Sequence, residues 1–141
     1  QKENKKHKIK KPILLKISPD CSLNEIDDII IVVEKSKIDG IVATNTSIDK
    51  NILFNSKYFE EGGISGKSIH KKSTDIIKYI SKKTNGKLPI IGVGGVSDHK
   101  TITDKFNAGA SLVQVYTGWI YEGPSLVKRM NKIMVNELSK N

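Results

Sequence analysis

Short apolar segments alternate with amphipathic ones along most of the chain, which is the pattern of a sheet covered by helices. Four runs rich in Ile, Val and Leu predict strands, each bounded by Gly, Pro or small polar residues. The predicted strands are Pro12 to Ile17, Gly40 to Thr44, Pro89 to Val93 and Ser111 to Tyr116. Because such runs are apolar rather than alternating, we expect strands covered on both faces, as in a parallel sheet.

Each predicted strand is followed by a segment in which apolar residues recur at helical spacing. Ser22 to Glu25 opens the first of these with a capping-box pattern. Gly109 suits a left-handed cap at the end of a short helix, roughly Asp98 to Ala108. The other two expected helices are one that carries Ile76, Ile77 and Ile80 and stops near Gly86, and one that opens with Pro124.

Four strand–helix units in series imply parallel strands with right-handed crossovers. Two α/β architectures fit this order: a small doubly wound sheet, or half of a (β/α)8 barrel. Small residues close the last two strands, Gly94 and Gly95 in one case and Thr117 and Gly118 in the other. In (β/α)8 barrels the loops after the last two strands often form a phosphate site. We therefore predict the C-terminal half of a TIM barrel, with these strands as strands five to eight.

The composition is that of a globular protein, with 37% apolar and 28% charged residues. The longest apolar run, Ile29 to Val33, is far shorter than the ~20 residues of a membrane span. A net charge of +9 raises the hypothesis of a nucleic-acid-binding domain, but Arg129 is the one arginine among 24 basic residues. Arginine is the residue whose planar fork matches phosphates and base edges. We expect no nucleic-acid partner, and we interpret residues 1–10 as a solvated basic loop of the parent barrel.

Cysteine and histidine give no sign of a disulfide or a metal site. Cys21 is the single cysteine, so no internal disulfide can form, and a reducing compartment fits. His7, His70 and His99 lack the spacing of metal ligands.

Polar residues that could meet a ligand stand near the carboxyl ends of predicted strands, where barrel enzymes place their sites. Lys16 lies inside an apolar strand, and it either reaches water at the barrel rim or places a cation against an electron-rich ligand. The sequence Thr44 to Thr46 could hydrogen-bond a planar heterocycle or cap a turn. Gly94 and Gly95 could bring backbone N–H groups close to an anion, or form a tight turn with no ligand.

Two glycine-rich segments look like nucleotide motifs but do not fit them. Gly92 to Gly95 is a poor Rossmann fingerprint, because Ser97 stands where the third glycine should be. Gly62 to Ser68 is one residue short of a Walker A loop and does not follow a buried strand. The long polar stretch that contains it, Ser47 to Lys72, is better interpreted as a flexible loop lining a site.

Taken together, several segments resemble class 2 (quinone-linked) dihydroorotate dehydrogenases. The matching motifs agree in order and spacing from Lys11 to Leu138, and the Tyr-Thr pair at 116–117 favours class 2 over class 1. The segments that carry the resemblance are Lys11 to Asp20, Ile38 to Gly40, Ala43 to Thr46, Gly62 to Lys67, Pro89 to Val96, Ala108 to Thr117 and Gly123 to Pro124.

The family oxidises dihydroorotate to orotate with FMN and passes the electrons to a quinone, in de novo pyrimidine (UMP) biosynthesis. The resemblance implies that Lys16 lies at the N1/O2 edge of the flavin, where a cation stabilises the charge that arrives with the hydride. It implies that Asn45 and Thr46 hold the orotate ring. The remaining residues that it implies for FMN are Thr44 and Gly66 at the flavin, and Gly95, Tyr116 and Thr117 at the phosphate.

The resemblance also indicates what this chain lacks. In class 2 enzymes the base that removes the C5 proton is a serine in the first half of the barrel, and the quinone tunnel and the membrane-associating helices are also N-terminal. No motif here resembles those parts, so we expect residues 11–141 to be the FMN-binding half, without the catalytic base and inactive when isolated. Membrane association would come through the N-terminal part, at the cytoplasmic face of the inner membrane if the source is bacterial.

Three alternatives to this interpretation remain. The chain could belong to a class 1 relative or another FMN-binding TIM-barrel oxidoreductase. It could be a non-catalytic flavin-binding fragment. It could also be the basic nucleic-acid-binding domain that its net charge suggests.

Overall fold

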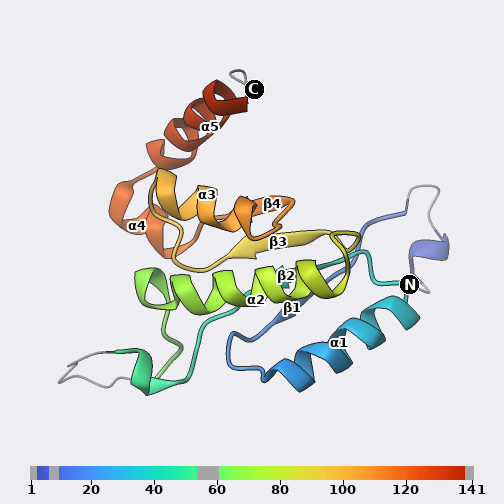
Figure 1. Cartoon of the computed structure of the whole chain (residues 1–141). Coiled ribbons are helices and arrows are strands. Elements are labelled where there is room, and N and C mark those ends of the chain that lie inside the picture. Colours follow the sequence, from blue (N-terminus) through green and yellow to red (C-terminus); the bar gives the residue numbers. More distant parts are fainter. Residues whose placement is uncertain (1–2, 7–9, 54–60, 139–141) are drawn as a thin grey trace.

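The computed structural model describes residues 3–6, 10–53 and 61–138 (Figure 1). Its strands are β1 (Leu14–Ile17), β2 (Gly40–Ala43), β3 (Ile90–Val93) and β4 (Leu112–Gln114). Its α-helices are α1 (Leu23–Lys35), α2 (His70–Lys83), α3 (His99–Asn107), α4 (Thr117–Glu122) and α5 (Ser125–Leu138), and its 3₁₀ turns are η1 (Asn4–Lys6), η2 (Lys50–Ile52) and η3 (Gly66–Ile69). Parts of the predicted basic loop, residues 1–2 and 7–9, lie outside the described residues, as do residues 54–60 of the long polar stretch.

The four strands form one parallel sheet in chain order, β1-β2-β3-β4, which confirms the predicted strand–helix series. Each strand is shorter than its apolar run. Pro12 and Pro89 fall outside β1 and β3, and a proline has no N–H to give to a ladder. At the other end, β4 stops at Gln114 because the chain turns at Tyr116 into α4.

The first helix begins where the capping pattern predicts, and the third follows the predicted Asp98 and ends before Gly109. Ser22 and Glu25 exchange the two hydrogen bonds of a capping box at the start of α1. Asp98 caps α3 in the same way through Thr101, and Gly109 beyond its end has a φ of +105°.

The last helix begins directly after Pro124, close to its predicted start, but the sequence did not reveal the helix before it. A separate helix, α4, precedes Pro124, and the chain passes through Gly123 at a φ of +76° before α5 begins at Ser125. A helix of six residues is too short to display a recognisable apolar period.

All the helices that pack on the sheet cover the same face. Ile26 of α1 and Ile77 of α2 meet in one core with Ile17, Ile41 and Ile90 of the strands. The third helix joins them, because Lys105 of α3 lies 3.3 Å from where a Cβ on Gly92 of β3 would stand. Figure 1 shows α1, α2 and α3 arranged along one side of the sheet. Sequential strand order with helices on one face is the arrangement of a barrel wall, whereas a doubly wound sheet has helices on both faces.

The opposite face of the sheet is uncovered in the described residues, as half of a barrel leaves its inner face. Register pairs Lys16 with Val42 and Ile91 with Leu112, so these side chains share that face. Lys16 is exposed, and Leu112 retains 63% of its accessible surface. This uncovered face corresponds to the interior of a barrel, and β1 and β4 are its open edges.

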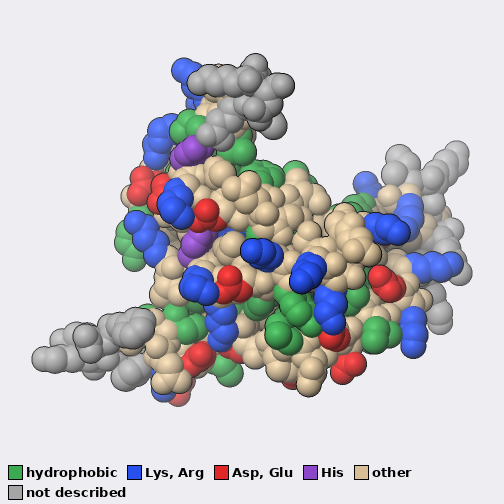
Figure 2. Space-filling model, in the orientation of Figure 1, with side chains coloured by type: hydrophobic (Ala, Val, Ile, Leu, Met, Phe, Trp, Pro, Cys, Tyr) green, Lys and Arg blue, Asp and Glu red, His purple; other side chains and the backbone are tan. Residues whose placement is uncertain are grey.

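The helical side carries most of the charge in view. Figure 2 shows Lys and Arg side chains interspersed with acidic and uncharged ones there. No helix within the described ranges is long and apolar enough to cross a membrane.

Candidate functional site

A hollow at the carboxyl ends of the strands is lined by all eight predicted site residues. They come from five separate places in the chain: β1, the turn after β2, the glycine-rich loop before α2, the turn after β3 and the turn after β4. The residues are Lys16, Thr44, Asn45, Thr46, Gly66, Gly95, Tyr116 and Thr117. The sequence could predict this gathering because parallel strands end at one edge of a sheet. The ligand that each residue contacts stays a prediction.

The hollow continues into a second one on the side of α4. Their volumes are about 210 and 440 Å³, and both are lined by Gly66, Gly95 and Thr117. Ser97, Tyr121 and Glu122 line the second alone. Pockets for cofactor-sized ligands span a few hundred Å³ or more, so the combined space suits a nucleotide.

Lys16 occupies the penultimate position of β1, on the uncovered face of the sheet. Its side chain is exposed while it lines the hollow, so its charge carries no desolvation cost. Both readings of Lys16 thus meet in one geometry: the ammonium reaches water at the rim and also stands beside a ligand-sized space.

The backbone after β2 is fixed between the two neighbouring strands. The Thr44 amide donates to the Val93 carbonyl of β3 at 2.8 Å, and the Asn45 amide donates to the Ile17 carbonyl of β1 at 2.7 Å. The Asn45 side-chain oxygen accepts a bond from the Thr46 amide at 2.9 Å. Thr44 is 1% exposed, so these residues are held in place before any ligand arrives.

The glycine-rich loop returns to the end of β2 and forms one wall of the hollow. Ser47 and Ile64 exchange two backbone hydrogen bonds, of 3.0 and 2.7 Å, in an isolated antiparallel bridge. A Cβ on Gly63 would lie 2.0 Å from Thr46 Oγ1, so only glycine permits this approach. On the far side Thr117 Oγ1 donates to Ser65 Oγ at 2.8 Å, which joins the wall to α4.

The turn after β3 offers backbone donors to the hollow. Gly94 and Gly95 have φ values of +118° and +71°, and a Cβ on Gly95 would lie 2.5 Å from the Cβ of His70. Neither the Gly95 nor the Thr117 amide donates a hydrogen bond to another described residue. Both residues line the hollow, and converging free N–H groups make a site that favours an anion.

A charged cluster that the sequence did not reveal supports the rim. The Asp20 carboxylate accepts bonds from Ser47 Oγ at 2.6 Å, the Ile48 amide at 2.7 Å and Lys72 Nζ at 2.6 Å. Burial alone would raise the pKa of Asp20, but the hydrogen bonds from Lys72, Ser47 and Ile48 outweigh it and hold that pKa below its usual value. The cluster ties the turn after β1 to the loop after β2 and to α2.

Other reactive side chains stay apart from the hollow. Cys21 is half-buried against the core, away from the residues that line it. Among the residues that the structure describes, no three of His, Cys, Asp or Glu lie close enough together to hold a metal ion.

Comparison with known proteins places the chain among relatives of one kind. The family model for dihydroorotate dehydrogenase matches residues 1–138. The dihydroorotate dehydrogenase (quinone) of Christiangramia forsetii is 49% identical over 132 residues, covering 94% of this chain and 39% of that protein. The enzyme of the same name from Aeromonas salmonicida is 46% identical over 120 residues, covering 84% of this chain and 36% of that protein.

Solved structures agree with the sequence relatives. Ligand-free DHODH from Eimeria tenella superposes with a TM-score of 0.85 at 34% identity, covering 92% of this chain and 36% of that one. The Eimeria tenella DHODH complex with ferulenol gives a TM-score of 0.82 at 36% identity, covering 93% of this chain and 35% of that one.

These matches confirm the predicted fold class: the four strands and their helices are the C-terminal half of a (β/α)8 barrel. The chain spans about two fifths of the length of the curated relatives it matches. By its family match and its relatives, the chain belongs to the dihydroorotate dehydrogenase family.

Proposed function

We propose that this chain supplies the FMN-binding and orotate-binding residues of a quinone-linked dihydroorotate dehydrogenase, which oxidises dihydroorotate to orotate in pyrimidine biosynthesis. The observation that carries the proposal is the convergence of a cation, an Asn-Thr pair and free backbone donors on one hollow, in a member of this family. The activity belongs to a whole protein of which this chain matches about two fifths.

The residues present fit FMN. The free amides of Gly95 and Thr117 would meet the phosphate, and the ring would lie toward Lys16 and Thr44 at the other side of the hollow. When bound, FMN would supply the hydride acceptor. Lys16 would stabilise negative charge at this side of the hollow, because a fixed cation needs no reorganisation at the moment of reaction.

Asn45 and Thr46 would orient the substrate ring. Their backbone is fixed by bonds to β1 and to the Asn45 side chain, so the substrate meets a preformed surface. The Asn45 side-chain oxygen already accepts a bond, which leaves its NH₂ group as the donor for a ring carbonyl.

The base that removes the C5 proton would come from outside this chain. None of the described residues that line the first hollow is a carboxylate or a histidine, and the one serine there, Ser65, receives a bond from Thr117. The quinone and the membrane would likewise be met mainly by the absent part, with the protein at the cytoplasmic face of the inner membrane if its source is bacterial.

The test is flavin content and turnover of the protein as its source produces it, with dihydroorotate and a water-soluble quinone. We expect bound FMN and orotate formation, and a protein without either would overturn the proposal. Asn45→Ala should raise the substrate KM while the bound flavin stays, whereas loss of flavin in that variant would contradict the substrate role. The 141-residue chain assayed by itself should form no orotate.

A further inference from the structure

A lysine lies fully buried behind the proposed phosphate end of the hollow. Lys105 of α3 is 0% exposed, and it lines neither hollow. Its ammonium donates to Ser73 Oγ at 2.9 Å, to Thr74 Oγ1 at 2.9 Å and to the His70 carbonyl at 3.2 Å. An ammonium has three donors, so Lys105 is fully satisfied inside the core.

All three acceptors belong to the first turn of α2, and this turn supports the end of β3. Ser73 Oγ donates to the carbonyl of Val93, the last residue of β3, at 2.6 Å. The turn of Gly94 and Gly95 then rests directly on α2. A Cβ on Gly94 would lie 3.0 Å from Ser73 Cβ, and one on Gly95 would lie 2.5 Å from His70 Cβ.

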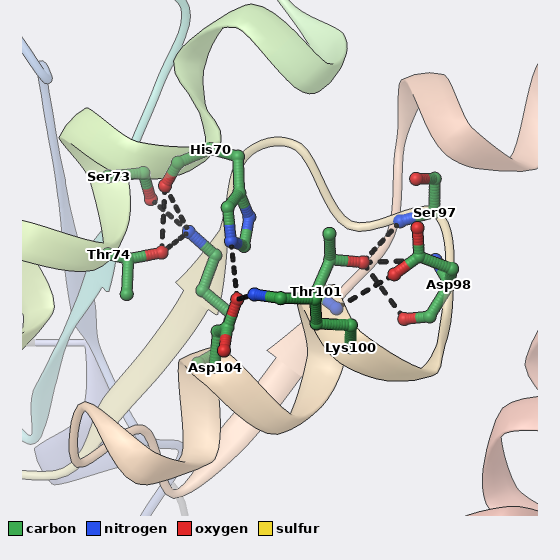
Figure 3. A network of polar contacts seen from close by, with 9 residues as sticks. His70, Ser73, Thr74, Ser97, Asp98, Lys100, Thr101 and Asp104 are labelled. Atoms are coloured by element: carbon green, nitrogen blue, oxygen red, sulfur yellow. Dashed lines mark hydrogen bonds and ion pairs between the residues drawn. The ribbon is translucent and has the colours of Figure 1, made fainter.

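A second contact holds the same turn of α2 from the side. His70 Nε2 and Asp104 Oδ2 are 3.1 Å apart, and Lys100 donates to the same Asp104 oxygen at 2.8 Å. Figure 3 shows His70, Ser73 and Thr74 of α2 gathered beside Asp104 of α3. The first turn of α2 is therefore fixed to α3 by one buried lysine and by the contact between His70 and Asp104.

Stability by itself gives no reason to place a lysine here. Replacing a buried, hydrogen-bonded charge by an apolar side chain of similar size is often neutral or stabilising. What an apolar residue could not supply is the directed link from α3 through Ser73 to the Val93 carbonyl.

We infer that Lys105 is a positioning residue for the phosphate of the bound flavin: it holds α2 against the end of β3, so that the Gly95 amide faces the hollow. This inference rests on the proposed function. It predicts that removing the lysine weakens binding of the flavin phosphate and leaves binding of the flavin ring unchanged.

The experiment compares FMN with riboflavin, which lacks the phosphate, on the apoprotein of the protein as its source produces it. Lys105→Met keeps the volume and removes the three bonds. We expect it to lower FMN affinity by about tenfold, the order of effect when a group supporting ligand contacts is lost. Riboflavin affinity should stay within about twofold, because the ring contacts are unchanged. Lys78→Met, at an exposed lysine of α2, is the matched control and should change neither affinity.

Two further outcomes keep the test decisive. If Lys105→Met does not fold, Ser73→Ala cuts the same link and should lower FMN affinity alone by about threefold, the worth of one net hydrogen bond. A folded variant of either kind that keeps the wild-type preference for FMN over riboflavin overturns the role of Lys105. A wild-type protein that binds neither flavin overturns the proposed function, and the inference with it.

Discussion

The two faces of the sheet differ although the same four strands make both. On the helix-covered face, Ile17, Ile41 and Ile90 retain at most 4% of their accessible surface. On the other face, Lys16 is exposed and Leu112 keeps 63% of its surface. Each face also has one lysine near the site, Lys105 buried behind the covered face and Lys16 open to the hollow. The helix-covered face therefore contributes mainly to stability, and the uncovered face contributes mainly to ligand contact.

The largest expected effect is a difference in the free energy of unfolding between substitutions on the two faces. Ile41→Ala removes a fully buried side chain and should lower the free energy of unfolding by about 2–5 kcal/mol. Val42→Ala, next to it but on the uncovered face, should cost under about 1.5 kcal/mol, because Val42 is only half-buried. Urea unfolding of the two variants measures the difference. Equal losses would show that the uncovered face is packed in solution.

A second comparison uses two glycines with nearly the same backbone conformation. Gly95 and Gly86 have φ values of +71° and +68°, so alanine at either costs about 1 kcal/mol in backbone strain. At Gly86 nothing lies within 4 Å of the new Cβ, whereas at Gly95 it meets His70. Gly95→Ala should therefore lose additional stability and release FMN, while Gly86→Ala keeps its flavin. Flavin absorbance after gel filtration reads this out, and equal flavin content in both variants would contradict the site assignment.

Substitutions of Lys16, on the uncovered face, should change the rate of flavin reduction rather than the stability of the fold. Lys16→Ala should slow flavin reduction in the whole enzyme by about 10²-fold and weaken FMN retention, with little change in the urea midpoint. Lys16→Arg should also be slow, because a wide planar cation does not replace a point charge. Stopped-flow reduction rates that match wild type would remove Lys16 from the mechanism.

Lys105, behind the covered face, should make the stability of the protein depend on pH. Burial lowers the pKa of Lys105 to about 8, from 10.5 for an exposed lysine, although the nearby carboxylates of Asp104 and Asp75 act to raise it. Between those values the unfolded chain binds the proton and the folded chain does not, so this group's contribution to stability rises with pH. Wild type should gain roughly 3 kcal/mol over Lys105→Met across that interval. Chemical unfolding at a series of pH values tests it, and a difference that is flat in pH would be inconsistent with a buried ammonium.

The smallest expected effect lies at the rim. Asp20→Asn should cost about 1–2 kcal/mol at neutral pH by weakening bonds from Lys72, Ser47 and Ile48. Because the folded pKa of Asp20 is lowered, its contribution is present above the unfolded pKa and fades as the pH falls below about 4. Asp28→Asn, at an exposed carboxylate of α1, is the control and should be neutral in thermal melts. A cost that persists undiminished in acid would argue against an electrostatic origin.

Much of this arrangement could be predicted from local sequence. The strands follow from apolar runs, and the gathering of Lys16, Thr44 and Gly95 follows from the parallel direction that the series of units requires. Which face the helices cover could not be read from the strands. A continuous apolar run looks the same whether its second face meets helices, a barrel interior or solvent.

Contacts between residues far apart in the chain could not be predicted from the sequence either. Lys105 follows Ile102 at helical spacing, which marks a lysine on an apolar helix face, but its acceptors on α2 lie more than thirty positions earlier. Asp20 belongs to a recognised motif, yet its bond to Lys72 spans 52 positions. Such pairs are created by the topology and have no local pattern.

The bridge between Ser47 and Ile64 has a consequence for how this region can change. The bridge brings the two ends of the segment between Ser47 and Ile64 together at one point of the barrel rim. The entropy of closing a loop grows only with the logarithm of its length, and a doubling costs about 0.6 kcal/mol. The length of this segment is therefore uncoupled from the shape of the hollow. Between Ser47 and the glycine-rich loop is therefore the place where a tag or a fluorophore should disturb the hollow least.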